Sequence, residues 1–314
     1  MQEKYIKKHL ARKLEDFAKS INDERLRKLV LRDTFITGGA ITSLLMDERL
    51  NDYDIYIENM DTAMQLTEYY VNKYFSGYNI KVMARSAAKE HKSGIVQDEN
   101  DDGIYVFIKS SGVIGDSDTE DEEEVEKVRV DEAELERTLD SVKLKDIPEG
   151  EKYVPLMITS NAITLSDKVQ LIIRFVGKPE EVHKNFDYVH CTCWYKYNTG
   201  ELHLPQEALT SLITKQLRYI GSRYPVASLF RVRKFIKRGW SINAGEMLKI
   251  IYQSSELDLN DFDVLRDQLV GVDMTYFAMV LSALAKVAAK GENGSARLDC
   301  DQSYLFTVID RVFN

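Results

Sequence analysis

The stretch TFITGGAITSLLMDERLNDYDIYIEN, residues 34–59, constrains the fold more than any other part of the chain. A short apolar run ends in two glycines, eight residues with helical spacing follow, and a second apolar run begins with DYDIYI. These patterns predict a strand over 34–37, a short helix over 39–46 and a strand over 52–57. Two carboxylates therefore stand one residue apart at the head of a strand that the core needs.

The carboxylates of Asp52 and Asp54 share one face of an extended strand, about 7 Å apart along the backbone. Two charges this close repel each other, and a divalent cation between them removes the repulsion. Mg²⁺ prefers oxygen ligands from one or two carboxylates together with substrate phosphates. Gly38 and Gly39 allow a ligand to approach the backbone, and a helix that opens at Ala40 offers free N–H groups to an anion. The pattern predicts a site for metal-bound triphosphate, with a solvated turn as the alternative.

Length and composition describe a globular chain. With 314 residues and 44% hydrophobic content, the chain is long enough for one large domain or two ordinary ones. It has no apolar run of about 18 residues that could span a membrane, and its charged N-terminus lacks the centre of a secretory signal. Three cysteines without a disulfide-like pattern suit a reducing interior. We expect a soluble, cytoplasmic protein without a membrane partner.

The formal net charge of −9 is unevenly placed along the chain. Residues 98–140 contain 17 acidic and 4 basic residues, which predicts an insertion or flexible surface loop. Residues 208–245 contain no acidic residue, and their basic residues are Lys215, Arg218, Arg223, Arg231, Arg233, Lys234, Lys237 and Arg238. Such a stretch is either a phosphate-binding surface or a solvated helix face.

The remaining patterns divide the chain into an α+β part over 1–204 and a helical part over 205–314. Helices are predicted over 4–32 (one or two), 60–75 and 178–186, and after Pro205 over 206–221, 224–239, 243–254, 273–291 and 303–313. Further strands are predicted over 78–84, 103–110, 153–166, 168–176 and 187–197. Asn59 and Asp61 are both plausible caps of the helix over 60–75.

Three collinear segments resemble one enzyme family. TGGAITSLLMDERLNDYDIYI resembles the Gly-Gly-Ala-Val-Arg-Asp-x-Leu-Leu … Asp-x-Asp signature of class II CCA-adding enzymes and bacterial poly(A) polymerases, in the DNA polymerase beta-like nucleotidyltransferase superfamily. KNFDYVHCTCWYKYNTGELHLP resembles the family's second motif, with Asp187 on its aspartate and Tyr195 on its tyrosine. LITKQLRYIG and SLFRVRKFIKRGW resemble helices that carry base-selecting and backbone-binding arginines. The resemblance covers about residues 34–58 and 168–242.

The resemblance implies a nucleotidyltransferase head with a mixed β-sheet, here 1–204, followed by an all-α domain that binds nucleotide and RNA, here 205–314. It implies template-independent transfer of NMP from an NTP, ATP or CTP favoured, to an RNA 3′ end such as that of a tRNA-like acceptor. The basic helices within 208–245 would bind that RNA.

The resemblance also implies roles for particular residues. Asp52 and Asp54 would hold Mg²⁺ or Mn²⁺, and Asp187 would bind the ribose or act as a third catalytic carboxylate. The implied nucleotide-binding residues are Gly38, Gly39, Ser43, Lys184, Asp187, Arg231 and Lys234.

The chain departs from the family at several motif positions. Thr42 and Ser43 replace an arginine and an aspartate, Cys191 replaces an asparagine, and Gln170 stands where a further acidic metal ligand is expected. Transfer chemistry survives these losses better than CCA specificity does. Two alternatives stay open: transfer to a protein or small molecule, and a non-catalytic binding or structural protein that retains the fold. The departures and the acidic insertion favour a divergent, viral lineage, which would act in the host cytoplasm.

A zinc site is the weaker candidate. Cys191 and Cys193 share a face if 187–197 is a strand, and His190 and His203 are near in sequence. A closed zinc site needs four ligands at suitable spacing, and the one other thiol, Cys300, is far along the chain.

Overall fold

The computed structural model describes residues 3–75, 80–84, 103–108, 150–158 and 162–261, together with 264, 265, 268, 288–290 and 296–298. The chain forms two compact units: the first contains 1–182 and 193–204, and the second contains 183–192 and 205–314. The chain therefore enters the second unit at residue 183, returns to the first unit at 193 and leaves it again after 204.

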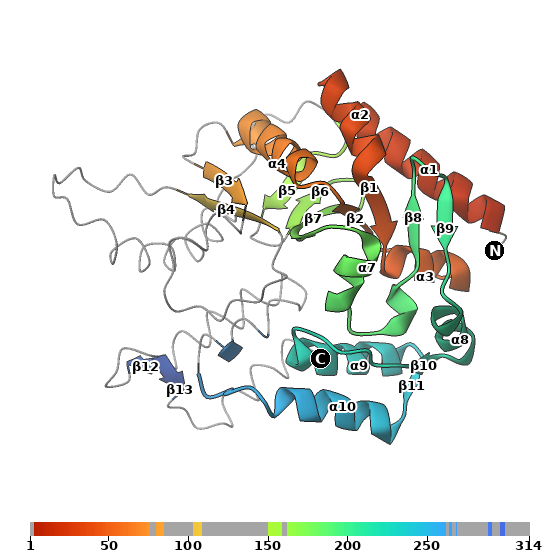
Figure 1. Ribbon diagram of the computed structural model, residues 1–314, viewed down its shortest axis with the longest axis vertical. Coiled ribbons are helices and arrows are strands. Elements are labelled where there is room, and N and C mark those ends of the chain that lie inside the picture. The colour runs from red at the N-terminus through yellow and green to blue at the C-terminus, as the bar shows by residue number, and fades with distance from the viewer. Residues whose placement is uncertain are drawn as a thin grey trace. The chain divides into compact units, whose positions relative to one another are not determined.

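The first unit is built on a seven-stranded mixed sheet in the order β5-β6-β7-β2-β1-β8-β9 (Figure 1). Its strands are β1 (Thr34–Thr37), β2 (Tyr53–Ile57), β5 (Pro155–Ile158), β6 (Ala162–Leu165), β7 (Val169–Val176), β8 (Trp194–Lys196) and β9 (Glu201–His203). β2 and β7 are parallel, and the other neighbouring strands are antiparallel. A separate antiparallel pair is formed by β3 (Ile80–Ala84) and β4 (Ile104–Ile108).

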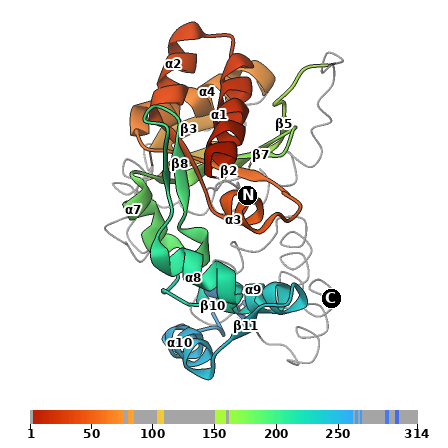
Figure 2. The ribbon, with the colours of Figure 1, turned by 90° about the vertical axis from the view of Figure 1, so that its right-hand side faces the viewer.

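Three helices of the first unit, α1 (Glu3–Lys19), α2 (Glu24–Asp33) and α4 (Met60–Tyr74), lie together on one side of the sheet (Figure 2). The helical spacing of the apolar residues explains their packing, because each helix buries one stripe; in α1 it contains Leu10, Leu14 and Phe17. Caps set where the helices begin: the Asp23 carboxylate accepts from Leu26 N, and the Asn59 side chain accepts from Thr62 N. Asn59, rather than Asp61, is therefore the cap of α4.

Two short helices also belong to the described part of the first unit. α3 (Gly39–Met46) connects β1 to β2, as the pattern in the sequence predicts, and α7 (Pro179–Val182) follows β7. Proline at the start of α7 is favourable because it lacks the N–H that a first helical turn leaves unpaired.

The second unit is mainly helical. Its described residues form the 3₁₀ turns η1 (His183–Asn185) and η2 (Val189–Cys191), the helices α8 (Gln206–Thr214), α9 (Pro225–Lys237) and α10 (Ala244–Ser254), and the short strands β10 (Gln216–Leu217), β11 (Ser241–Ile242), β12 (Ala288–Lys290) and β13 (Ala296–Leu298). The fold class is thus α+β with a mixed sheet, as expected. The second unit is helical but not all-α as predicted, because it contains the short strands β10 to β13. In the described ranges, no helix is both long and apolar enough to cross a membrane.

Several predicted elements are wrong in part. The strand predicted over 153–166 is two antiparallel strands, β5 and β6, and the helix predicted over 178–186 continues after Val182 as the 3₁₀ turn η1. The strand predicted over 187–197 is limited to β8, because Cys191 N bonds Tyr188 O and Thr192 N bonds Val189 O, which forms the η2 turn. The helix predicted over 206–221 ends at Thr214, where Lys215 adopts a left-handed conformation with φ 50°. Within the segment 273–291, predicted to be a helix, residues 288–290 form the strand β12. The rest of that segment, the helix predicted over 303–313 and most of the acidic stretch 98–140 lie outside the described residues.

Candidate functional site

Gly38 joins β1 to α3 in a conformation that only glycine adopts readily. Its φ is 79° and its ψ is −143°, and it is the N-cap of α3 without a side chain to cap it. A Cβ at this position would lie 3.3 Å from Oδ2 of Asp54. The bare backbone of Gly38 therefore lies directly beside that carboxylate, at the helix end whose first N–H groups have no partner within the helix.

The two candidate carboxylates differ in their surroundings. Asp54 is the second residue of β2 and is half-buried, whereas Asp52 is exposed and comes just before β2, which begins at Tyr53. In the sheet, Asp54 is the register partner of Thr37 on β1 and of Gln170 on β7. The structure thus brings Gly38, Asp54 and Gln170 together. Asp52 lies two residues before Asp54, just outside the strand.

Residues of α1 and Lys168, just before β7, contact the start of β2 and the loop before it. Nε2 of His9 on α1 lies 2.6 Å from the Tyr53 hydroxyl, and the Lys13 ammonium lies 4.8 Å from the centroid of the Tyr53 ring. On the other side, Tyr53 N donates to Lys168 O over 2.8 Å, and Lys168 Nζ donates to Leu50 O over 3.1 Å. These contacts fix the residues on both sides of Asp52. Nothing in the sequence pairs His9 with a tyrosine 44 positions away.

The donor set fits a hard cation. Across the described ranges there is no group of three or more His, Cys, Asp and Glu side chains that could hold a metal ion. Mg²⁺ does not require such a group, because one or two carboxylates together with substrate phosphates are sufficient. Asp52, Asp54 and the amide oxygen of Gln170 are oxygen donors of the kind that Mg²⁺ and Mn²⁺ prefer.

The zinc hypothesis finds no support. Cys193 is buried, and burial raises the pKa of its thiol to about 12. His203 stacks on Trp194 with ring centroids 5.1 Å apart. Cys191 lies in η2 rather than on a strand with Cys193.

In the second unit, Asp187 and Arg231 form an ion pair. Nη1 of Arg231 lies 2.5 Å from Oδ2 of Asp187, whose side chain is only 8% exposed. Burial lowers the pKa of Arg231, but the charge and hydrogen bond of Asp187 more than offset this, so the pKa is raised. Asp187 therefore joins the segment 183–192 to α9.

The other predicted nucleotide-binding residues are divided between the units. Ser43 is buried in α3 of the first unit, whereas Lys184 and Lys234 are exposed in the second unit. Gly38, Asp52 and Asp54 thus belong to one unit, and Lys184, Asp187, Arg231 and Lys234 to the other.

An aromatic cluster in the second unit surrounds His190, which is fully buried. The His190 ring lies 4.5 Å from that of Trp240 and 4.8 Å from that of Phe235, centroid to centroid. Burial lowers the pKa of His190 to about 4. This cluster and the Asp187 ion pair explain why the segment 183–192 belongs to the second unit.

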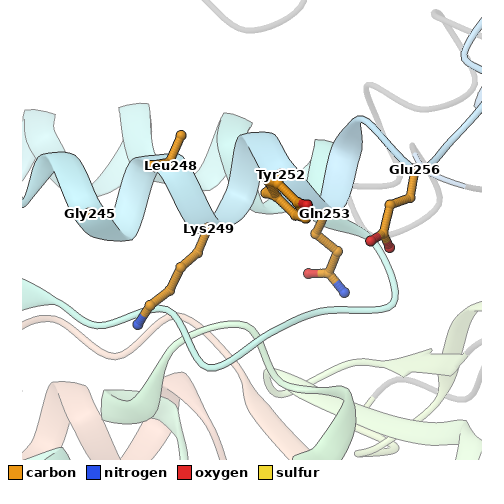
Figure 3. Close-up of a pocket in the computed structure, with 6 residues that line it drawn as sticks. All are labelled: Gly245, Leu248, Lys249, Tyr252, Gln253 and Glu256. Atoms are coloured by element: carbon orange, nitrogen blue, oxygen red, sulfur yellow. The ribbon is translucent and has the colours of Figure 1, made fainter.

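A groove of about 380 Å³ lies along α10 (Figure 3). Its lining residues are Gly245, Leu248, Lys249, Tyr252, Gln253 and Glu256. Gln253 has a structural role, because its Oε1 accepts from the Tyr219 hydroxyl and from Ser222 N. None of the site residues predicted from the sequence lines this groove.

Among solved structures, the chain is similar to CCA-adding enzymes at low levels. One is the CCA-adding enzyme of Thermotoga maritima complexed with tRNA, which is 13% identical with a TM-score of 0.38; the match covers 88% of this chain and 56% of that one. Another is the Bacillus stearothermophilus CCA-adding enzyme in complex with CTP, which is 11% identical with a TM-score of 0.35; the match covers 86% of this chain and 51% of that one.

A curated relative is "Gabija anti-defense 2" of Bacillus phage SPbetaL7. It is 25% identical over 107 residues, which are 33% of this chain and 27% of the relative. The match thus spans little more than a quarter of that protein's length.

A family model described as "Gabija anti-defense 2 family protein" matches residues 8–215, well over half of the chain. The matched region begins in α1, includes the whole sheet of the first unit and ends just after α8. It therefore includes Gly38, Asp52, Asp54 and Asp187. The chain belongs to the Gabija anti-defense 2 family.

Proposed function

We propose that the chain is a Mg²⁺- or Mn²⁺-dependent nucleotidyltransferase of the DNA polymerase beta-like superfamily. The observation that carries the proposal is the contact between Gly38 and Asp54: a glycine with positive φ at the start of a helix lies beside a half-buried carboxylate. This arrangement suits a triphosphate whose cation is bound by acidic side chains.

Each part of the site has a task in the proposed reaction. The backbone of Gly38 and Gly39 and the first turn of α3 would receive the β- and γ-phosphates. Asp52 and Asp54 would hold the cation. When bound, the cation supplies activation of the acceptor hydroxyl and stabilises the charge on the α-phosphate and on the departing pyrophosphate. An acceptor oxygen forms a bond to the α-phosphorus, the bond to the β-phosphate oxygen breaks, and the acceptor's proton is lost to solvent.

The acceptor that we propose first is RNA, with ATP or CTP as the donor. Supporting it is the stretch 208–245, which is basic and free of acidic residues; within it Arg218, Arg233, Lys234 and Lys237 are exposed. Phosphate binding by exposed basic residues is the usual source of nucleic-acid affinity. The nucleotide-binding roles of Lys184, Asp187, Arg231 and Lys234 stay predictions.

A protein acceptor is the second candidate, and one surface favours it. On α10, Leu248, Ile251 and Tyr252 are 61%, 53% and 70% exposed. Exposed aliphatic and aromatic side chains gathered on one helix are typical of protein contacts rather than of contacts with RNA. The family description names action against a defence, and transfer of NMP to a component of that defence would be such an action. The cytoplasm of an infected bacterium is the compartment that we propose, because the curated relative is a phage protein.

The test is transfer of label from α-³²P-labelled NTPs with Mg²⁺ or Mn²⁺, offering total RNA and total protein as acceptors. Asp52→Ala and Asp54→Ala serve as controls. We expect label on RNA that is lost in both variants. Label on protein would select the second candidate. Absence of transfer with either metal, while both variants fold and bind nucleotide as well as the unchanged chain does, would contradict the enzyme and leave a non-catalytic binding protein.

A further inference from the structure

Four neighbouring strands of the first unit each place one polar side chain in a single row. Thr164 on β6 is the register partner of Gln170 on β7, Gln170 is the partner of Asp54 on β2, and Asp54 is the partner of Thr37 on β1. Register partners lie on the same face of a sheet, roughly 5 Å apart. The row therefore runs across the sheet on the face that carries Asp54.

This polar row contrasts with the next positions on the same face. Two residues further along, Phe35 and Tyr56 are buried and stacked, with ring centroids 5.6 Å apart. The row lies at one end of the sheet, since Thr37 is the last residue of β1 and Asp54 is the second residue of β2. Three of its members, Thr164, Gln170 and Asp54, are partly exposed. A polar row at a partly open sheet end is suited to hold a polar ligand.

Gln170, a register partner of Asp54, carries an amide oxygen that can bind a cation without adding charge. Its Nε2 lies 3.5 Å from Oγ1 of Thr164, so the amino group is directed at that hydroxyl. The amide carbonyl oxygen keeps its ability to bind a cation, because Gln carbonyls are accepted ligands of hard divalent ions. The row thus offers one carboxylate and one amide, and Asp52 adds the second carboxylate from outside the strand.

We propose that the amide oxygen of Gln170 binds the metal ion together with the carboxylates of Asp52 and Asp54. Because Gln170 replaces a third carboxylate and is neutral, the cation and the nucleotide bind only together. The inference rests on the proposed function, because the nucleotide's phosphates supply the charge that the protein lacks. Mg²⁺ gives up its water reluctantly, and two carboxylates alone, one of them the exposed Asp52, retain it weakly. Thr164 is a positioning residue that orients the amide of Gln170.

Two binding measurements on the full chain test this proposal. The first follows free Mn²⁺ by electron paramagnetic resonance without nucleotide. The second follows binding of a labelled, non-hydrolysable ATP analogue by equilibrium dialysis, with Mn²⁺ or with EDTA. The variants are Gln170→Glu, Gln170→Leu, Thr164→Val and Asp54→Asn. Gln206→Glu, on the exposed start of α8, is the matched control for added charge.

We expect the unchanged chain to bind the analogue only with Mn²⁺, and to bind Mn²⁺ weakly without the analogue. Gln170→Glu should raise affinity for Mn²⁺ alone by about tenfold or more, because a third carboxylate lies next to Asp54. Gln170→Leu and Thr164→Val should weaken metal-dependent binding of the analogue several-fold. Gln206→Glu should match the unchanged chain.

Tight Mn²⁺ binding by the unchanged chain without the analogue would overturn the proposal. The proposal would also be overturned if Gln170→Glu and Gln170→Leu bound Mn²⁺ and the analogue as the unchanged chain does, while Asp54→Asn lost metal-dependent binding of the analogue. A different result, in which no form shows metal-dependent binding and Asp54→Asn changes nothing, would contradict the proposed function itself. If Gln170→Glu fails to fold, judged by circular dichroism, the neutral Gln170→Leu variant decides between these outcomes.

Discussion

The guanidinium of Arg231 donates a hydrogen bond to the carboxylate of Asp187 over 2.5 Å, between residues 44 positions apart. Asp187→Ala should lower the free energy of unfolding by about 2 kcal/mol, because Arg231 loses a charged partner. The effect stays below that of a fully buried pair because the Arg231 side chain is 37% exposed. Urea unfolding measures this change.

The double variant Asp187→Ala with Arg231→Met is the control for the ion pair. It should lose less than the sum of the single losses, and additive losses would contradict a direct interaction. A ribose contact has a different signature. In that case Asp187→Asn would weaken binding of ATP more than binding of 2′-deoxy-ATP, with little change in the urea midpoint.

Gly38 and Gly39 are expected to respond oppositely to alanine. Gly38→Ala should cost roughly 1–3 kcal/mol, because its φ of 79° is unfavourable for a side chain and the new Cβ would lie 3.3 Å from Asp54 Oδ2. Gly39 begins α3, and a Cβ there meets nothing within 4 Å, so Gly39→Ala should be neutral or slightly stabilising. Thermal unfolding measures both changes.

Nucleotide binding by the Gly39→Ala variant distinguishes a role of the two glycines in phosphate binding from a role in stability alone. If phosphate approaches the backbone here, Gly39→Ala should weaken binding of the ATP analogue while leaving the melting temperature unchanged. Unaltered binding by Gly39→Ala would place the triphosphate elsewhere.

His9 is expected to support the head of β2 through the Tyr53 hydroxyl, 2.6 Å away. His9→Ala and Tyr53→Phe should each cost about 1 kcal/mol of stability, and together little more than either alone. His9→Gln, which can still bond to the hydroxyl, should restore most of the loss. Affinity for the ATP analogue should follow the same order, since Tyr53 lies between Asp52 and Asp54. An unchanged affinity in all three variants would limit His9 to a role in stability.

His190 is expected to make the stability of the second unit depend on pH. Its pKa is lowered to about 4 from an ordinary 6.5, first by burial and further by Arg238, while Asp187 acts in the opposite direction. Between these values the unfolded chain binds a proton that the folded chain does not, so stability falls as the pH falls from 6.5 to 4. The full loss is about 3 kcal/mol.

Urea unfolding at pH 7 and pH 4.5, followed by tryptophan fluorescence, measures this dependence. The Trp240 ring lies 4.5 Å from His190 and reports on the same cluster. His190→Phe should remove most of the pH dependence in this window. The same slope in His190→Phe as in the unchanged chain would assign the dependence to other groups.

Local patterns in the sequence were sufficient for the elements that carry the candidate site. The glycine pair, the apolar spacing over 39–46 and the alternation in DYDIYI predict β1, α3 and β2, and the structure confirms all three. The helical spacing of Leu10, Leu14 and Phe17 likewise predicts α1. These features succeed because turn conformation, helix period and strand alternation depend on residues that are neighbours in the chain.

The sequence by itself therefore determined an α+β chain with two carboxylates beside a glycine turn. Tertiary structure decided that Gln170 is the register partner of Asp54, that His9 reaches Tyr53, and that Asp187 is paired with Arg231. It also decided that residues 189–191 form the 3₁₀ turn η2 instead of continuing a strand, and that the segment 183–192 belongs to the second unit. The three residue pairs join residues that lie dozens to more than a hundred positions apart. Their pairing is set by packing, burial and charge in the folded chain, which no local pattern encodes.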